Sequence, residues 1–236
     1  MIYRIADFNI EIEPLFNGTV HALAPYAGEA GAKADFAVSV IKPEVLAMRA
    51  DFEKYYGETA HHPSYIERLV LHKKISDEIL MRGGFMMHGA LIEYRGVGYM
   101  FTAKSGTGKT THIELWKKHF GDDVHIVNGD KPFVRLIDGE IYAYGTPWCG
   151  KEGYNINTRV KLSKLCFIER AETNSIAKIS ELEAISRLMS QVDVVSSRDL
   201  GAQLAMLDEL VSRCDMYLLK CNMDSEAAEV AYNGMK

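Results

Sequence analysis

The chain alternates between short apolar runs and longer segments with helical spacing of apolar positions. An interrupted apolar stripe predicts a helix that opens at Pro63-Ser64 and stops at Gly83-Gly84. Short apolar runs bounded by turn residues predict strands. These strands span residues 85–93, 97–102, 124–127, 164–169 and 216–220. Further helices are predicted over residues 109–120, 181–195, 198–213 and 224–235.

The first 60 residues have a different pattern. Apolar positions over residues 2–12 and an apolar run over residues 36–41 predict strands. The intervening stretch, residues 17–34, is rich in Gly and Ala and predicts a loop. We therefore expect a strand-rich segment of residues 1–60 that packs on a domain formed by residues 61–236.

The alternation of strands and helices predicts an α/β fold. An Asp138-Gly139 pair between two apolar runs predicts a β-hairpin. Because the strands of a hairpin are antiparallel, we expect a mixed β-sheet rather than a purely parallel one.

Composition and charge narrow the class of protein. The chain has 236 residues, 47% of them hydrophobic, and a net charge of -5, which is typical of a globular protein without a broad basic face. We therefore expect neither a nucleic acid nor a membrane as a partner, and the charged start of the chain predicts no signal peptide. The cysteines form no CxxC pair, so reduced thiols and a cytoplasmic location are expected. They are Cys149, Cys166, Cys214 and Cys221.

The most informative motif is a glycine-containing loop between a predicted strand and a predicted helix. It reads Ser105-Gly106-Thr107-Gly108-Lys109-Thr110 and follows the order of a phosphate-binding loop, or P-loop. Glycines let backbone N–H groups face a phosphate, and the helix adds the positive end of its dipole. We expect this loop to bind nucleotide phosphates, with the charge of Lys109 on the β and γ groups and Thr110 on Mg²⁺. Ala103 replaces the leading glycine of the usual pattern.

An acid is expected beside such a loop to hold the metal ion. Asp130 follows the apolar run Val124–Val127 and stands at the end of the sequence Asn128-Gly129-Asp130. Metal-binding acids of nucleotide enzymes commonly stand at strand ends, so we predict that Asp130 and Thr110 bind Mg²⁺. The alternative interpretation is an ordinary turn aspartate.

Several segments together resemble the catalytic core of HPr kinase/phosphorylase. They are Met87–Ile92, Gly96–Gly98, Ser105–Thr110 and Ile126–Asp130. The loop also resembles that of phosphoenolpyruvate carboxykinase, which shares the fold. The segments Asn128–Pro132 and Tyr144–Lys151 look like HPr-kinase-related bacterial proteins, some of which phosphorylate a serine on a peptide. The resemblance covers about residues 60–225.

The resemblance implies an α/β core with a mixed β-sheet and a P-loop, of the type in the HPr kinase C-terminal domain and phosphoenolpyruvate carboxykinase. It implies an ATP- and Mg²⁺-dependent kinase that acts on a hydroxyl, in particular serine, of a peptide, protein or small molecule. It assigns Ser105–Thr111 to the phosphates, places His88 near the transferred phosphoryl group and suggests a homo-oligomer. HPr kinases usually carry two adjacent acids after the strand, and Gly129 stands at the first position. Either His88 or Asp130 would then take the acceptor proton.

Two alternatives to this kinase stay open. One is a carboxykinase-like small-molecule phosphotransferase, although the chain is too short for a full carboxykinase. The other is a nucleotide-binding sensor without turnover, which the missing acid at Gly129 favours.

Five further residues are candidates with a second interpretation each. Lys131 and Lys151 would stabilise the charge of a transferring phosphoryl group, or be solvated. Trp148 would line an acceptor pocket or anchor its loop. Arg159 would contact phosphate or lie on the surface. His112, on the helix after the loop, would approach a nucleotide or face solvent.

Overall fold

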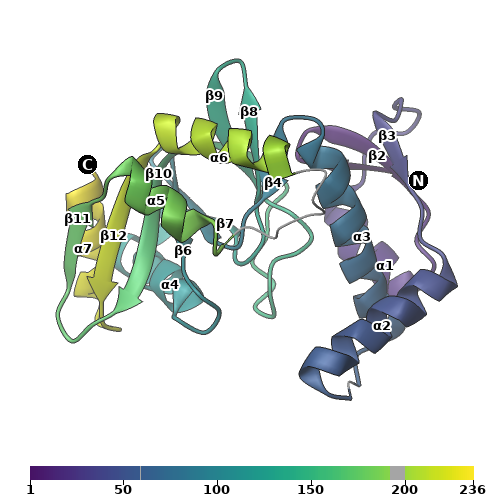
Figure 1. Cartoon of the computed structure of the whole chain (residues 1–236), viewed down its shortest axis with the longest axis horizontal. Helices are drawn as coiled ribbons and strands as arrows, with labels where there is room; N and C mark the ends of the chain where they lie inside the picture. The colour runs from purple at the N-terminus through teal and green to yellow at the C-terminus, as the bar shows by residue number, and fades with distance from the viewer. Residues whose placement is uncertain (59, 192–199) are drawn as a thin grey trace. The chain divides into compact units, whose positions relative to one another are not determined.

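The computed structural model describes residues 1–58, 60–191 and 200–236 (Figure 1). Its contacts divide the chain into two compact units, Met1–Ile79 and Leu80–Lys236. The boundary predicted at residue 60 falls inside the first unit, and the packing of residues 1–60 on the rest stays a prediction.

The first unit contains the strands that the sequence predicts. β1 (Ile2–Ile5) pairs antiparallel with β2 (Phe8–Ile12), and β3 (Phe36–Val38) joins β2 in parallel. The predicted loop between β2 and β3 is wrong in part, because it contains α1 (Asn17–Leu23) and the 3-10 helix η1 (Ala24–Tyr26).

Two longer helices complete the first unit. α3 (Pro63–Leu80) confirms the predicted helix, although it ends before Gly83. The sequence did not predict α2 (Lys42–Tyr56). Val45 is the buried residue of this helix, so α2 has no apolar stripe that periodicity could detect.

The second unit carries a large sheet and the helices that cover it. Its strands are β4 (Gly84–Met86), β5 (Ala90–Tyr94), β6 (Val97–Thr102), β7 (Val124–Asn128), β8 (Phe133–Ile137), β9 (Glu140–Tyr144), β10 (Arg159–Arg170), β11 (Ser175–Lys178) and β12 (Asp215–Cys221). Its helices are α4 (Lys109–Phe120), η2 (Gly121–Asp123), α5 (Glu181–Leu188), α6 (Leu200–Arg213) and α7 (Glu226–Met235). Helix α5 ends earlier than predicted, and the predicted helical residues 192–195 and 198–199 lie outside the described residues.

The sheet is mixed, as predicted, and it is curled (Figure 1). Its order is β4-β8-β9-β10-β6-β5-β7, and β12 pairs with β10 and β11. The long strand β10 runs parallel to β6 and β12 and antiparallel to β9. The predicted hairpin is present, with φ angles of 50° at Asp138 and 79° at Gly139 in the turn between β8 and β9.

Alternate side chains of each central strand pack on opposite faces. Tyr99 and Phe101 of β6 join a buried cluster that includes Trp116 of α4 and residues of α7. Met100 joins the other cluster, which includes Leu207 of α6 and residues of α5. Helices α4 and α7 therefore cover one face and α5 and α6 the other (Figure 1). The loop that follows β6 lies at the edge where the parallel strands β6 and β10 both end.

Two segments of the second unit differ from the strands that the sequence predicts. The strand predicted over residues 85–93 is interrupted, because His88 and Gly89 lie between β4 and β5. The sequence also did not predict β11, whose residues are mostly exposed and lack an apolar run.

No helix in the described parts of the chain combines the length and apolar character that a bilayer crossing requires.

Candidate functional site

The β6–α4 loop, Ala103–Gly108, is the centre of the candidate site. Gly106 and Gly108 have φ angles of 77° and 124°, a region that disfavours residues with a side chain. A Cβ atom at either position would meet no atom within 4 Å. Backbone conformation, and not crowding, therefore explains the need for glycine in this loop.

Helix α4 begins directly at the end of this loop. The first backbone hydrogen bond of the helical i to i−4 type runs from the His112 N–H to the Gly108 carbonyl, at 2.9 Å. The amides of the preceding residues, Lys109 to Thr111, have no acceptor within a regular helix. Gly108 caps the helix without a side-chain hydrogen bond. These amides and the helix dipole make the end of the loop suitable for an anion.

Lys109 places a buried cation beneath the loop. Its side chain is 7% exposed, and Nζ donates a hydrogen bond to the Ala103 carbonyl at 3.1 Å. Burial lowers the pKa of this ammonium group, and attraction to Asp130 opposes that shift. A buried cation is stabilised by an anionic partner, so this position favours a negatively charged ligand.

Asp130 and His88 come together from two different connections. Asp130 lies in the β7–β8 turn, Gly129–Pro132, and His88 lies between β4 and β5. Nε2 of His88 is 3.3 Å from Oδ1 of Asp130, and the Gly89 N–H donates to the Asp130 carbonyl at 2.8 Å.

The carboxyl group of Asp130 has a lowered pKa. Burial acts to raise this pKa, but the hydrogen bond and charge of His88 and the charges of Lys131 and Lys109 outweigh burial. Asp130 is therefore ionised at neutral pH, and it lies beside two of the cations that the sequence singled out.

Asn128 holds the turn that carries Asp130. Its side chain is fully buried, and Oδ1 accepts from the N–H groups of Asp130 and Lys131 at 3.0 and 2.8 Å. Its Nδ2 donates to the carbonyl and the hydroxyl oxygen of Thr146, both at 3.1 Å. The roles of Asn128 and Thr146 were not predicted from the sequence. An Asn at a strand end before Gly-Asp was the available signal, because such side chains bind backbone groups two residues ahead.

Gly129 is enclosed by neighbouring backbone. A Cβ atom at this position would lie 2.9 Å from the Cys149 carbonyl oxygen and 3.4 Å from Cβ of Tyr154. The Gly129 N–H donates to the Tyr154 carbonyl at 2.9 Å. No acidic side chain fits here without a shift of the β9–β10 loop, Gly145–Thr158, and the missing acid therefore has a structural reason.

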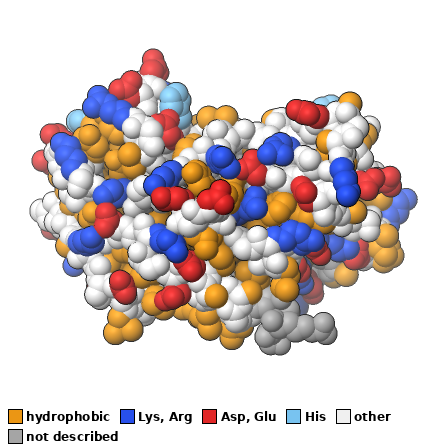
Figure 2. All heavy atoms as spheres, turned by 90° about the horizontal axis from the view of Figure 1, so that it is seen from above, with side chains coloured by type: hydrophobic (Ala, Val, Ile, Leu, Met, Phe, Trp, Pro, Cys, Tyr) orange, Lys and Arg blue, Asp and Glu red, His pale blue; other side chains and the backbone are white. Residues whose placement is uncertain are grey.

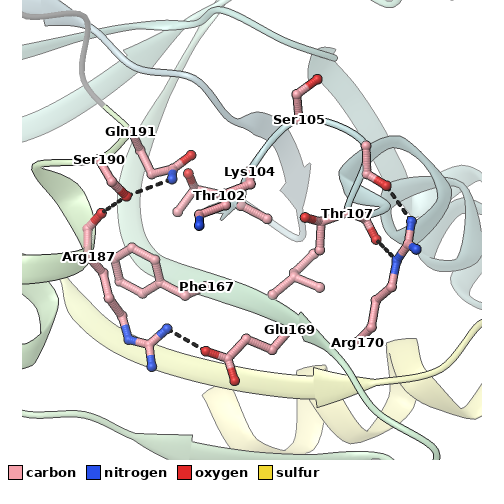
Figure 3. Close-up of a pocket in the computed structure, with 13 residues that line it drawn as sticks. Thr102, Lys104, Ser105, Thr107, Phe167, Glu169, Arg170, Arg187, Ser190 and Gln191 are labelled. Atoms are coloured by element: carbon pink, nitrogen blue, oxygen red, sulfur yellow. Dashed lines mark hydrogen bonds and ion pairs between the residues drawn. The ribbon is translucent and has the colours of Figure 1, made fainter.

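A pocket of about 680 Å³ opens beside the first half of the β6–α4 loop (Figure 3). It is lined by Thr102, Ala103, Lys104, Ser105, Gly106, Thr107, Phe167, Ile168, Glu169, Arg170, Arg187, Ser190 and Gln191. Nη1 of Arg187 lies 2.8 Å from the Glu169 carboxylate. The Gln191 carbonyl accepts from the His88 N–H at 3.1 Å, which links the pocket wall to the His88 backbone.

Basic side chains are concentrated in the lining of this pocket. On the face drawn in Figure 2, basic and acidic side chains are interspersed over the surface. The pocket lining, in contrast, includes the cations Lys104, Arg170 and Arg187 and the carboxylate of Glu169. An acidic protein can therefore still present a basic pocket.

The remaining predicted site residues lie in different surroundings. Lys131 lies beside Asp130 and acts on its charge. Trp148 is 7% exposed and packs edge-to-face on Phe133, with ring centres 6.0 Å apart, so it anchors its loop. The Lys151 side chain is 91% exposed. Arg159 begins β10 at the end far from the β6–α4 loop, and its guanidinium lies 4.8 Å from the ring centre of Tyr142.

His112 takes neither of its predicted positions. It is buried, and its Nε2 accepts a hydrogen bond from Nε1 of Trp116 at 3.0 Å. Burial lowers the pKa of His112 to about 3. This histidine is therefore neutral at physiological pH and supports α4 from inside the core.

The sequence predicts that the oxygen groups of Thr110 and Asp130 hold a metal ion. Thr110 lies in the first turn of α4 and is partly buried. Within the described residues, no group of three His, Cys, Asp or Glu side chains is placed to hold a metal on its own. Mg²⁺ commonly takes one or two protein oxygens and completes its shell with phosphates and water, so this donor set fits a nucleotide-associated Mg²⁺.

Comparison with known proteins gives a distant likeness. No family model matches the chain, and no curated protein matches it. Among solved structures, the chain is similar to the HPr(Ser) kinase/phosphatase from Coxiella burnetii, with 8% sequence identity and a TM-score of 0.36. The alignment covers 63% of this chain and 94% of that chain.

Proposed function

We propose that the chain is an ATP-dependent phosphotransferase related in type to HPr kinase. Its acceptor would be a hydroxyl, serine foremost, of a peptide, protein or small molecule. The observation that carries the proposal is the buried ammonium of Lys109 beneath a glycine loop and a helix N-terminus, with the ionised Asp130 nearby. This arrangement supplies the charges and amides that a nucleotide's phosphates require.

The phosphate chain would bind along Ser105–Thr111. Lys109 would neutralise the phosphate oxygens on which charge increases during transfer, and the loop amides would hold them in place. Lys131 is a second cation close to Asp130 and would add to this neutralisation.

Thr110 and Asp130 would hold Mg²⁺. When bound, this ion offsets negative charge on the phosphates. The lowered pKa of Asp130 supports this role, because a ligand for Mg²⁺ must be ionised at neutral pH.

His88 is the better candidate for removal of the acceptor proton. A carboxylate with a lowered pKa is a weak base, and histidine is the residue type whose usual pKa lies nearest neutral pH. The contact of Nε2 with Asp130 would keep a proton on that nitrogen and leave Nδ1 as the acceptor.

A nucleotide-binding sensor without turnover is the second candidate. The observation that favours it is the enclosed Gly129, where no second acid can be accommodated. A sensor would share the phosphate site with the kinase and lack only the transfer step.

Incubation of the full chain with γ-labelled ATP and Mg²⁺ separates these two functions. The assay would include serine-containing peptides and hydroxyl metabolites, and binding of ATP would be measured in parallel. A kinase transfers label, and His88→Gln binds ATP while transfer falls by about 100-fold. Binding by the wild type with no transfer to any acceptor would support the sensor, and the absence of binding would contradict both functions.

A further inference from the structure

Arg170, the last residue of β10, contacts the β6–α4 loop from outside the predicted motif. Its Nε donates to the Thr107 carbonyl at 3.0 Å, and Nη2 donates to the Gly106 carbonyl (Figure 3). One guanidinium group therefore binds the carbonyls of two consecutive residues, although Arg170 and Thr107 are 63 positions apart in sequence.

These two contacts determine which way the loop amides point. In a planar trans peptide, the carbonyl and the N–H point in opposite directions. A Thr107 carbonyl that faces Arg170 therefore turns the Gly108 N–H away from the Arg170 guanidinium. A Gly106 carbonyl that faces Arg170 likewise turns the Thr107 N–H away, toward the Lys104 carbonyl, which accepts it at 3.2 Å.

Glycine alone does not fix these peptide orientations. Gly106 and Gly108 flank the two peptides, and glycine adopts positive and negative φ angles almost equally readily. A loop with this freedom must be ordered when a ligand binds, and that ordering weakens affinity. A group that holds the peptides in advance removes part of this loss.

We infer that Arg170 is a positioning residue that orients the β6–α4 loop for nucleotide phosphates. The inference rests on the proposed function, because the ligand is the phosphate chain of a nucleotide. Arginine suits this role better than lysine, since its planar fork presents two N–H groups in fixed geometry, whereas an ammonium is a point charge. Nothing in the P-loop sequence pattern identifies this residue.

Titration of the full chain with ADP and Mg²⁺ tests the inference. Arg170→Ala is expected to weaken ADP binding about tenfold. Arg170→Lys should recover little of the loss, and guanidinium chloride, far below denaturing concentrations, should restore binding to Arg170→Ala. Arg170→Gln serves the same purpose if the alanine variant does not fold.

Arg213→Ala is the matched control. Nη1 of Arg213 donates to the Gly139 carbonyl at 2.9 Å, so this arginine also binds a turn carbonyl, but at the β8–β9 hairpin. Its ADP affinity should equal that of the wild type.

Three results would overturn this role. Wild-type affinity in Arg170→Ala would show that the loop is ordered without Arg170. Weak binding in Arg170→Ala that guanidinium chloride does not restore would indicate general damage to the fold. No ADP binding by the wild type would contradict the proposed function itself, and the role of Arg170 with it.

Discussion

Two glycine-containing turns meet at the candidate site and use glycine for opposite reasons. In the β6–α4 loop, Gly106 and Gly108 need positive φ angles and have open space around the missing side chain. In the β7–β8 turn, Gly129 has no such angle, but a Cβ atom would lie 2.9 Å from the Cys149 carbonyl. The first turn leaves its backbone accessible to a ligand. The second is packed against the β9–β10 loop and holds Asp130 in place.

Loss of Asn128 should have the largest effect on the packed turn. Asn128→Ala removes hydrogen bonds to Asp130, Lys131 and Thr146 from a fully buried position. We expect the free energy of unfolding to fall by about 3 kcal/mol, because several buried polar groups lose their partner. Urea denaturation of the full chain measures this, and an unchanged midpoint would show that Asn128 does not hold the turn.

Alanine at the two kinds of glycine should separate crowding from conformation. Gly129→Ala is expected to lower the free energy of unfolding by about 2 kcal/mol through overpacking. Gly106→Ala should lower it by only about 1 kcal/mol through φ strain, while weakening ADP binding clearly. Paired denaturation and ADP titration measure both effects. Equal effects of the two substitutions on stability and binding would remove the distinction between the turns.

Buried His112 of α4, the helix that follows the β6–α4 loop, should make the stability of the fold depend on pH. The folded pKa of His112, about 3, is well below the usual histidine value of about 6.5 in the unfolded chain. As the pH falls, His112 therefore binds a proton in the unfolded chain before it does so in the folded one. The contribution of neutral His112 to the free energy of unfolding is complete above about pH 6.5 and decreases as the pH falls toward 3. At pH 5.5 the decrease is about 1 kcal/mol.

Replacement of His112 should remove this part of the acid sensitivity. His112→Gln is expected to reduce the difference in unfolding free energy between pH 7.5 and 5.5, whatever its effect at either pH alone. His119→Gln, at an exposed position on the same helix, should leave the difference unchanged. An unchanged difference in His112→Gln would show that this histidine titrates normally.

The β6–α4 loop could be predicted from the sequence, and the packing of the β7–β8 turn could not. Strand β6, helix α4 and the loop between them follow from local apolar patterns and glycine spacing, and β6 and α4 have the predicted bounds. The reason for Gly129 depends on Cys149 and Tyr154, which reach it through the β9–β10 loop. The contact of Arg170 depends on the parallel register of β10 with β6. Contacts between segments far apart in sequence leave no local pattern.

We propose that the β6–α4 loop and Lys109 bind nucleotide phosphates. Calorimetric titration of the full chain with ADP and Mg²⁺ tests this most directly. The test variant is Lys109→Met, which keeps the apolar stem of the side chain. The control is Lys118→Met, at an exposed position of α4. We expect Lys109→Met to weaken binding about 100-fold, or by about 2.7 kcal/mol, and Lys118→Met to bind like the wild type. Wild-type affinity in Lys109→Met would show that Lys109 does not bind the phosphates.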